Sequence, residues 1–142
     1  MQTTACLMKP RQFQLQDSVY PVPQQDEVII RVQYVGICGS DLHFYETGRI
    51  GEVVLQEPFV MGHEFCGIVE DSCGVEGAPP AGTRVALDPA IPCGQCVYCQ
   101  AGQYNICPQI RFTGFPPYPG ALRPWIAMPL ECVFPIPGGI PM

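Results

Sequence analysis

The sequence predicts a mainly β domain with few short helices. Residues 28–35 are the most strand-like stretch, because valine and isoleucine dominate it and β-branched side chains favour a pleated strand. Seventeen prolines and fifteen glycines among 142 residues leave few windows for a long helix. Hydrophobic residues make up 47% of the chain and charged residues only 14%, which indicates a folded domain with its own core.

Strands are expected along the whole chain. Short strands are predicted within the first 35 residues, and the clearer ones lie at 12–15, 28–35, 65–69, 84–87, 121–127 and 132–136. Two turn-rich loops interrupt them at 74–82 and 112–120. Three aromatic residues of the second loop are candidates to line an apolar cleft, although core or lid packing explains them equally well: Phe112, Phe115 and Tyr118.

Charge and composition exclude several classes of partner. The net charge of −6 argues against binding to a nucleic acid or to an anionic membrane surface. No apolar run is long enough to span a bilayer, and residues 1–6 lack the basic and apolar regions of a secretory signal peptide. Nine cysteines without such a signal point to reduced thiols and metal binding in a cytoplasmic protein.

The densest chemical signal is a run of four cysteines between residues 93 and 107. Their spacing is C-x2-C-x2-C-x7-C, and the members are Cys93, Cys96, Cys99 and Cys107. Structural zinc takes four thiolates, and short loops let neighbouring cysteines reach one ion, so we predict a structural zinc site. An iron–sulfur cluster also uses closely spaced cysteines, but the bacterial ferredoxin run has three residues before its last cysteine rather than seven. A disulfide framework is the remaining alternative.

A second set of metal-binding side chains lies in two separate glycine-flanked segments. Cys38, His63 and Glu64 offer a thiolate, an imidazole and a carboxylate, which is a three-ligand pattern typical of catalytic zinc with an open fourth position. Because His63 and Glu64 are adjacent, one of them is a candidate for a supporting role behind the metal. Taken singly, Cys38 fits a small buried side chain and His43 a surface residue. Asp41 is a candidate start for a short helix.

Together these motifs resemble the zinc-dependent medium-chain alcohol dehydrogenases, and most of all their sorbitol (polyol) dehydrogenase branch. The resemblance rests on residues 36–43, on residues 62–64 and on the four-cysteine run, and residues 45–51 are similar to the polyol branch in particular. It implies a GroES-like catalytic domain over residues 1–142, built as a partly open β-barrel with a zinc lobe at about 90–110. The Rossmann cofactor domain of the family is absent from this chain, in which no G-x-G-x-x-G follows a strand.

The resemblance also assigns roles to individual residues. It implies a proton relay through Ser40 and His43, with His43 next to the cofactor ribose. The resemblance also implies two zinc sites. The ligands of the catalytic ion would be Cys38, His63 and Glu64, and those of the structural ion Cys93, Cys96, Cys99 and Cys107. Phe44 departs from the polyol branch, where tyrosine is frequent. The implied cofactors are therefore two Zn²⁺ ions and NAD(P).

The implied reaction is oxidation of a secondary alcohol or polyol, such as sorbitol or xylitol, to a ketone. The partners expected are a small alcohol substrate and further copies of the same chain in a homo-oligomer, and the isolated chain is expected to be inactive. Two alternatives stay open. One is a stand-alone zinc-binding or interaction module without dehydrogenase activity, and the other is a threonine- or formaldehyde-type dehydrogenase of the same superfamily.

Overall fold

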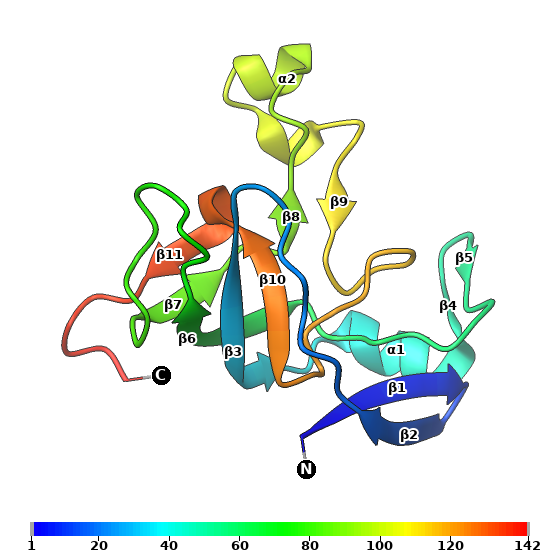
Figure 1. The fold of residues 1–142 in the computed structure, drawn as a ribbon. Helices are drawn as coiled ribbons and strands as arrows, with labels where there is room; N and C mark the ends of the chain where they lie inside the picture. The colour runs from blue at the N-terminus through cyan, green and yellow to red at the C-terminus, as the bar shows by residue number, and fades with distance from the viewer. Residues whose placement is uncertain (1, 142) are drawn as a thin grey trace.

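The computed structural model describes residues 2–141 and shows the predicted mainly β domain (Figure 1). Its strands are β1 Thr3–Lys9, β2 Gln12–Asp17, β3 Glu27–Gly36, β4 Arg49–Ile50, β5 Val53–Val54, β6 Glu64–Asp71, β7 Arg84–Leu87, β8 Ala90–Ile91, β9 Arg111–Phe112, β10 Trp125–Pro129 and β11 Val133–Pro135. The helices are α1 Gly39–Thr47, α2 Val97–Gln100 and the 3₁₀ turns η1 Tyr104–Ile106 and η2 Leu130–Cys132. None of the helices in residues 2–141 has the length and apolar character needed to cross a bilayer.

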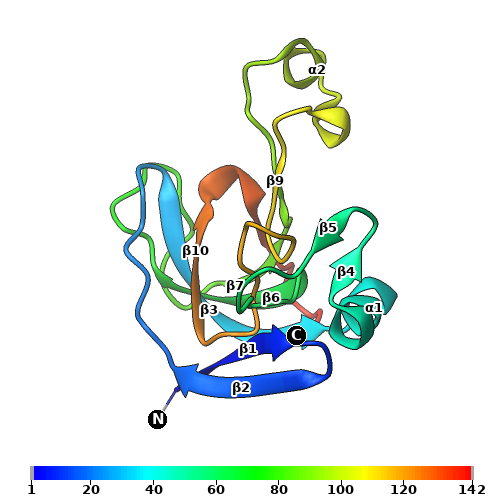
Figure 2. The same ribbon diagram turned by 90° about the vertical axis from the view of Figure 1, so that its right-hand side faces the viewer.

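Five strands form one antiparallel sheet in the order β10-β3-β6-β7-β11. The long β3 pairs with β6 from Ile29 opposite Asp71 to Gly36 opposite Glu64, and the register shifts twice along the way. Such irregularities bend and twist a strand, and the sheet curls into part of a barrel (Figures 1 and 2). The expected partly open β-barrel is therefore confirmed.

Most buried apolar side chains of residues 2–141 belong to two clusters. The larger cluster fills the curled sheet and consists of Val28, Ile30, Phe65, Val69, Val85, Leu87, Ala121, Ile126, Met128, Cys132 and Val133. The smaller cluster lies beside helix α1 and consists of Leu7, Phe44, Phe59 and Met61. In the second cluster the rings of Phe44 and Phe59 meet edge to face, 6.1 Å apart. Helix α1 is thereby packed against the segment that leads into β6.

Two smaller units extend from this body. The β1–β2 hairpin is joined to it by mutual backbone hydrogen bonds between Leu7 and Phe59, of 2.8 and 3.0 Å. The cysteine lobe, residues 92–110, stands between β8 and β9 and projects away from the sheet, at the opposite end of the molecule from the hairpin (Figures 1 and 2). The short pairing of β8 with β9 forms its base.

Two predicted element boundaries were wrong. The strand expected at 121–127 begins only at Trp125, because the backbone N–H groups of 120–122 donate instead to the carbonyl oxygens of residues 60–62, at 2.6–3.0 Å. Helix α1 begins at Gly39 rather than at Asp41. Asp41 lies in its first turn, where Oδ2 accepts a hydrogen bond from the Cys38 N–H at 3.0 Å.

Candidate metal centres

The four cysteines of the lobe converge on one point. The sulfur atoms of Cys93, Cys96, Cys99 and Cys107 all lie within 4.8 Å of one another. Individual Sγ–Sγ distances are 3.5 Å for Cys96–Cys99, and 3.9 Å for both Cys93–Cys99 and Cys96–Cys107. Zinc–sulfur bonds of about 2.3 Å in a tetrahedron give S···S edges of about 3.8 Å. The four side chains are therefore arranged as a tetrahedral thiolate site requires.

The lobe folds locally around these sulfurs. Cys96 precedes α2, and its Sγ accepts from the Cys99 N–H at 3.5 Å, while the Cys93 N–H donates to the Cys107 Sγ at 3.5 Å. Among residues 93–107 only Cys107 is buried. Apolar packing within the lobe is thus slight, and the sulfur cluster is its centre.

Two thiols of the cluster have pKa values shifted in opposite directions. Backbone N–H groups of Gln95 and Cys96 lower the pKa of Cys93 to about 6. Desolvation, and then the nearby sulfur of Cys96, raises the pKa of Cys99 to about 12. The protein alone therefore favours one thiolate but opposes another a few ångströms away. A bound cation relieves this opposition, because metal ligation deprotonates each thiol outright.

The second predicted set also converges. Cys38 stands between β3 and α1, His63 directly precedes β6, and Glu64 is the first residue of that strand. Their ligand atoms lie within 4.8 Å of one another. Cys38 and His63 are half-buried and Glu64 is exposed, so the group lies at the surface of the domain with one side open. A sulfur, a nitrogen and an oxygen donor at this separation fit a zinc ion with three protein ligands.

The local backbone explains how adjacent residues serve one site. Successive side chains of a regular strand point to opposite faces of the sheet. His63 and Glu64 would therefore point in opposite directions if both residues lay within a regular strand. His63 lies just before β6, and the preceding Gly62 has a φ of +94°, a conformation that L side chains rarely adopt. This irregular backbone before β6 is compatible with the approach of both His63 and Glu64 to Cys38.

Asp41 is a functional candidate that the sequence analysis missed, having assigned it only to the helix start. Its carboxylate is buried, with Oδ1 lying 3.6 Å from His63 Nδ1 and Oδ2 bonded to the Cys38 N–H. A carboxylate beside Nδ1 holds the imidazole so that Nε2 faces the ligand position. One side chain thus orients two candidate ligands. The only signal in the sequence is its place three residues after Cys38.

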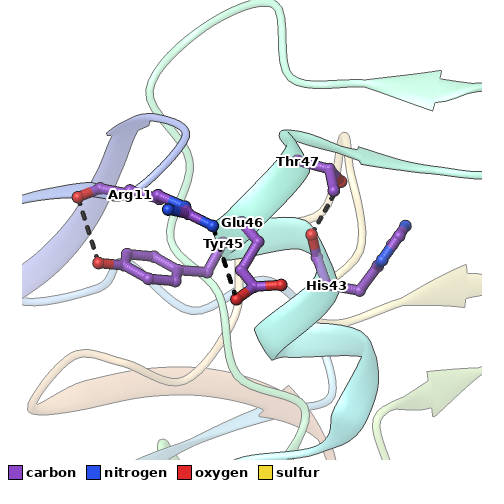
Figure 3. Close-up of polar contacts among 5 residues, drawn as sticks. All are labelled: Arg11, His43, Tyr45, Glu46 and Thr47. Carbon is purple, nitrogen blue, oxygen red and sulfur yellow. Dashed lines mark hydrogen bonds and ion pairs between the residues drawn. The ribbon is translucent and has the colours of Figure 1, made fainter.

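The two predicted relay residues are placed differently. Ser40 lies in the first turn of α1 and its hydroxyl donates to Cys38 Sγ at 3.3 Å, so it stands directly at the candidate site. His43 is exposed and lies on the other side of α1 from Tyr45 and Arg11 (Figure 3). Its carbonyl accepts from the Thr47 hydroxyl at 2.8 Å. Within residues 2–141 no hydrogen bond joins Ser40 to His43.

A cavity of about 180 Å³ opens beside the second metal centre. Its polar lining residues are Ser40, Asp41 and His63, and the others are Phe44, Ile50, Phe112, Gly114 and Phe115. The Phe112 ring lies 5.7 Å from the His63 ring, between centroids. Two of the three aromatic residues predicted to line a cleft are therefore found here, whereas Tyr118 instead forms a β-bridge with Phe115.

The disulfide alternative is wrong for this fold. All nine cysteines are free thiols, and the four outside the two clusters are Cys6, Cys66, Cys73 and Cys132. Cys6 and Cys132 are buried side chains, as expected for structural residues. Burial and the nearby charges of Glu131 and Asp88 raise the pKa of Cys132 to about 12.

Comparison with known proteins gives a consistent result. A family model described as the alcohol dehydrogenase GroES-like domain matches residues 24–138. Sorbitol dehydrogenase of Bacillus subtilis is 40% identical over 136 residues, which is 96% of this chain and 38% of that protein. The chain therefore spans well under half of the length of this relative.

Solved structures are also similar. An alcohol dehydrogenase from Escherichia coli CFT073, solved with NADH, is 31% identical with a TM-score of 0.83, covering 99% of this chain and 40% of that one. L-idonate 5-dehydrogenase from Escherichia coli is 28% identical with a TM-score of 0.85, covering 96% of this chain and 40% of that one.

Proposed function

Because the chain belongs to the alcohol dehydrogenase GroES-like domain family, we propose that it is the zinc- and alcohol-binding part of an NAD(P)-dependent oxidoreductase. The observation that carries this proposal is the convergence of Cys38, His63 and Glu64 beside a cavity that Ser40 and His63 line. Three ligands of this kind leave one position open, as catalytic zinc sites do. The similar dehydrogenase that was solved with NADH supports a nicotinamide cofactor, held by residues outside 1–142.

Zinc held by Cys38, His63 and Glu64 would act as a Lewis acid toward the oxygen of an alcohol. The chain's own residues do the rest. Ser40 lines the cavity, where its hydroxyl accepts the proton of the substrate hydroxyl as its own proton moves on. Because no hydrogen bond within the described residues joins Ser40 to His43, the proton would pass from Ser40 through the cofactor ribose to the exposed His43 and then to solvent. Asp41 keeps His63 oriented, and the aromatic wall excludes water from the reacting carbon.

The four-cysteine lobe would hold a second, structural zinc ion. Its sulfur positions match a tetrahedral thiolate site, and four protein ligands leave no position for a substrate. We therefore propose two ions per chain with different roles. A homo-oligomer remains a prediction that the present observations do not test.

For the substrate we propose a polyol such as sorbitol or xylitol, on the strength of residues 45–51 and of the sorbitol dehydrogenase relative. One observation favours a second candidate, a less hydroxylated secondary alcohol. Phe44, Ile50, Phe112 and Phe115 form an apolar wall that offers no hydrogen-bonding side chain to additional hydroxyl groups. A panel of polyols and simple secondary alcohols, assayed with an active protein that joins residues 1–142 to a cofactor-binding domain, distinguishes the two.

Metal stoichiometry tests the central proposal. The chain purified without chelator should contain two equivalents of zinc by elemental analysis, and Cys38→Ser should contain one. Cys73→Ser, which changes an exposed cysteine outside both clusters, should keep two and serves as the control. One equivalent or less in the parent chain would contradict the two-site proposal.

The chain alone should not oxidise sorbitol with NAD⁺ or NADP⁺, since hydride transfer needs the nicotinamide about 3–3.5 Å from the carbon.

A further inference from the structure

We propose that Gly36 is a positioning residue for the Cys38 centre, because its lack of a side chain leaves the space through which the Glu64 carboxylate reaches the metal. The inference rests on the zinc site proposed above. It assigns a function to a glycine that is neither a ligand nor part of a turn with positive φ.

The β3–β6 pairing places the two residues face to face. Gly36 is the last residue of β3 and stands directly opposite Glu64, the first residue of β6. Side chains of directly opposed residues lie on the same face, with Cβ atoms about 4.5–5.5 Å apart. A Cβ built on Gly36 would lie 2.7 Å from Glu64 Oε2 and 3.1 Å from Glu64 Cβ. The Glu64 side chain therefore lies across Gly36, and its carboxylate occupies the room that any other residue would fill.

The position of the Glu64 side chain depends on the room above Gly36 and not on a hydrogen bond. Within residues 2–141 its carboxylate has no hydrogen-bond or ion-pair partner, and the side chain is exposed. Cys38 and His63 are instead tied to the buried Asp41. Glu64 is thus the candidate ligand whose direction depends most on its immediate neighbour. A methyl group at position 36 would turn the carboxylate away from Cys38 and towards solvent.

No other feature of Gly36 requires a glycine. Its φ lies outside the left-handed region, it is exposed, and the three atoms nearest to an added Cβ all belong to Glu64. Gly114 shows the contrast, because its φ is +85° and an added Cβ would lie 2.6 Å from the Gly62 carbonyl oxygen. Alanine at position 36 should therefore displace the Glu64 carboxylate and shift the Glu64 Cβ by only a few tenths of an ångström. Gly39 provides a matched control in the same segment, since an added Cβ there meets no atom within 4 Å.

The test measures metal affinity and does not depend on turnover. The four-cysteine lobe is first saturated with one equivalent of Zn²⁺, and Co²⁺ is then titrated as the spectroscopic probe of the second site, in competition with a chelator. The parent chain and Gly39→Ala should bind Co²⁺ equally well. Gly36→Ala should bind it about 10- to 100-fold more weakly, as is usual when a group that orients a ligand is lost. The thermal midpoint of Gly36→Ala should match that of Gly39→Ala.

A double-mutant cycle with Glu64→Ala assigns the effect to this pair. If Gly36 acts through the Glu64 carboxylate, adding Gly36→Ala to Glu64→Ala should change Co²⁺ affinity less than about twofold. Equal affinity of Gly36→Ala and Gly39→Ala would overturn the inference while leaving the metal site intact. An undiminished effect in the Glu64→Ala background would overturn it as well. Failure of the parent chain to bind a second ion would refute the proposed site and this inference together.

Discussion

Replacing Cys96 by serine should unfold the cysteine lobe and leave the curled sheet folded. Cys96 contributes one of the four sulfurs, and among residues 93–107 only Cys107 is buried. Ordering a chain segment costs about 1–2 kcal/mol per residue in backbone entropy. Apolar burial cannot offset this cost in so exposed a lobe, whereas structural zinc contributes about 10–16 kcal/mol of apparent binding free energy in small peptides. Loss of tetrahedral ligation should therefore remove the main stabilisation of the lobe.

The sheet should be almost unaffected, because its core contains no residue from 93–107. We expect the thermal unfolding midpoint of the sheet to move by less than the roughly 2–4 °C that a stability change of 1 kcal/mol produces in a domain of this size. Ile30→Ala provides the contrast, since Ile30 is fully buried and its truncation should cost about 2–5 kcal/mol. Cys73→Ser controls for the loss of a thiol.

Hydrogen exchange read residue by residue separates the two outcomes. The amides of residues 100–103 donate to carbonyl oxygens of residues 96–99, so they should lose protection in Cys96→Ser while the β3–β6 amides keep theirs. A single cooperative transition, lowered as far as in Ile30→Ala, would refute the reasoning. It would mean that the lobe and the sheet are one folding unit in spite of their separate packing.

Three further predictions concern single side chains. Asp41→Asn should weaken zinc affinity at the Cys38 centre about 10- to 100-fold, because the amide keeps an acceptor for the Cys38 N–H but loses the charge beside His63. Competition with a chelator measures the zinc affinity, and an unchanged affinity would contradict this prediction. His43→Ala, in an active protein that includes a cofactor-binding domain, should slow turnover by about 10²- to 10⁴-fold, most strongly at low pH where solvent bases are scarce; an unchanged pH–rate profile would return His43 to a surface role. Cys132→Ala should reduce the loss of stability between pH 9 and 12. Burial raises the pKa of this thiol from 9.0 to about 12, so the unfolded chain loses its proton first and the folded state loses stability as the pH rises. Denaturant unfolding at several pH values measures how the free energy of unfolding changes with pH, and a dependence equal to that of the parent would argue against this prediction.

Most of the sheet could be predicted from local sequence, because β-branched residues and alternation mark β3, β6 and β7 within a few residues of their bounds. The strand expected at 121–127 failed for a non-local reason. Residues 120–122 give their backbone N–H groups to residues 60–62, some sixty positions earlier, and no pattern within the segment records that partner.

The candidate sites divide in the same way. The four cysteines are close in sequence, so their spacing alone predicts that they meet. Cys38 and His63 are brought together by the β3–β6 pairing, and the chemistry of their side chains is enough to mark them as candidate ligands. Asp41 was missed because its function depends on His63, which is remote in sequence. Gly36 was missed because what matters there is empty space, and that becomes visible only when Glu64 is placed opposite it.

The backbone contact between Gly62 and Gly114 bears on how this domain can diversify. The Gly62 carbonyl accepts from the Ala121 N–H at 2.8 Å, and a Cβ on Gly114 would lie 2.6 Å from the same oxygen. The loop that carries Phe112 and Phe115 is thus fixed to the segment that carries a metal ligand, through main-chain atoms that do not depend on side-chain identity. Under the proposed function, exchange of these two aromatic side chains would change the shape of the cavity and leave the candidate metal ligands in place. The shape of the cavity and the geometry of the candidate metal centre therefore depend on different atoms, the first on side chains of the 112–120 loop and the second on the segment that precedes β6.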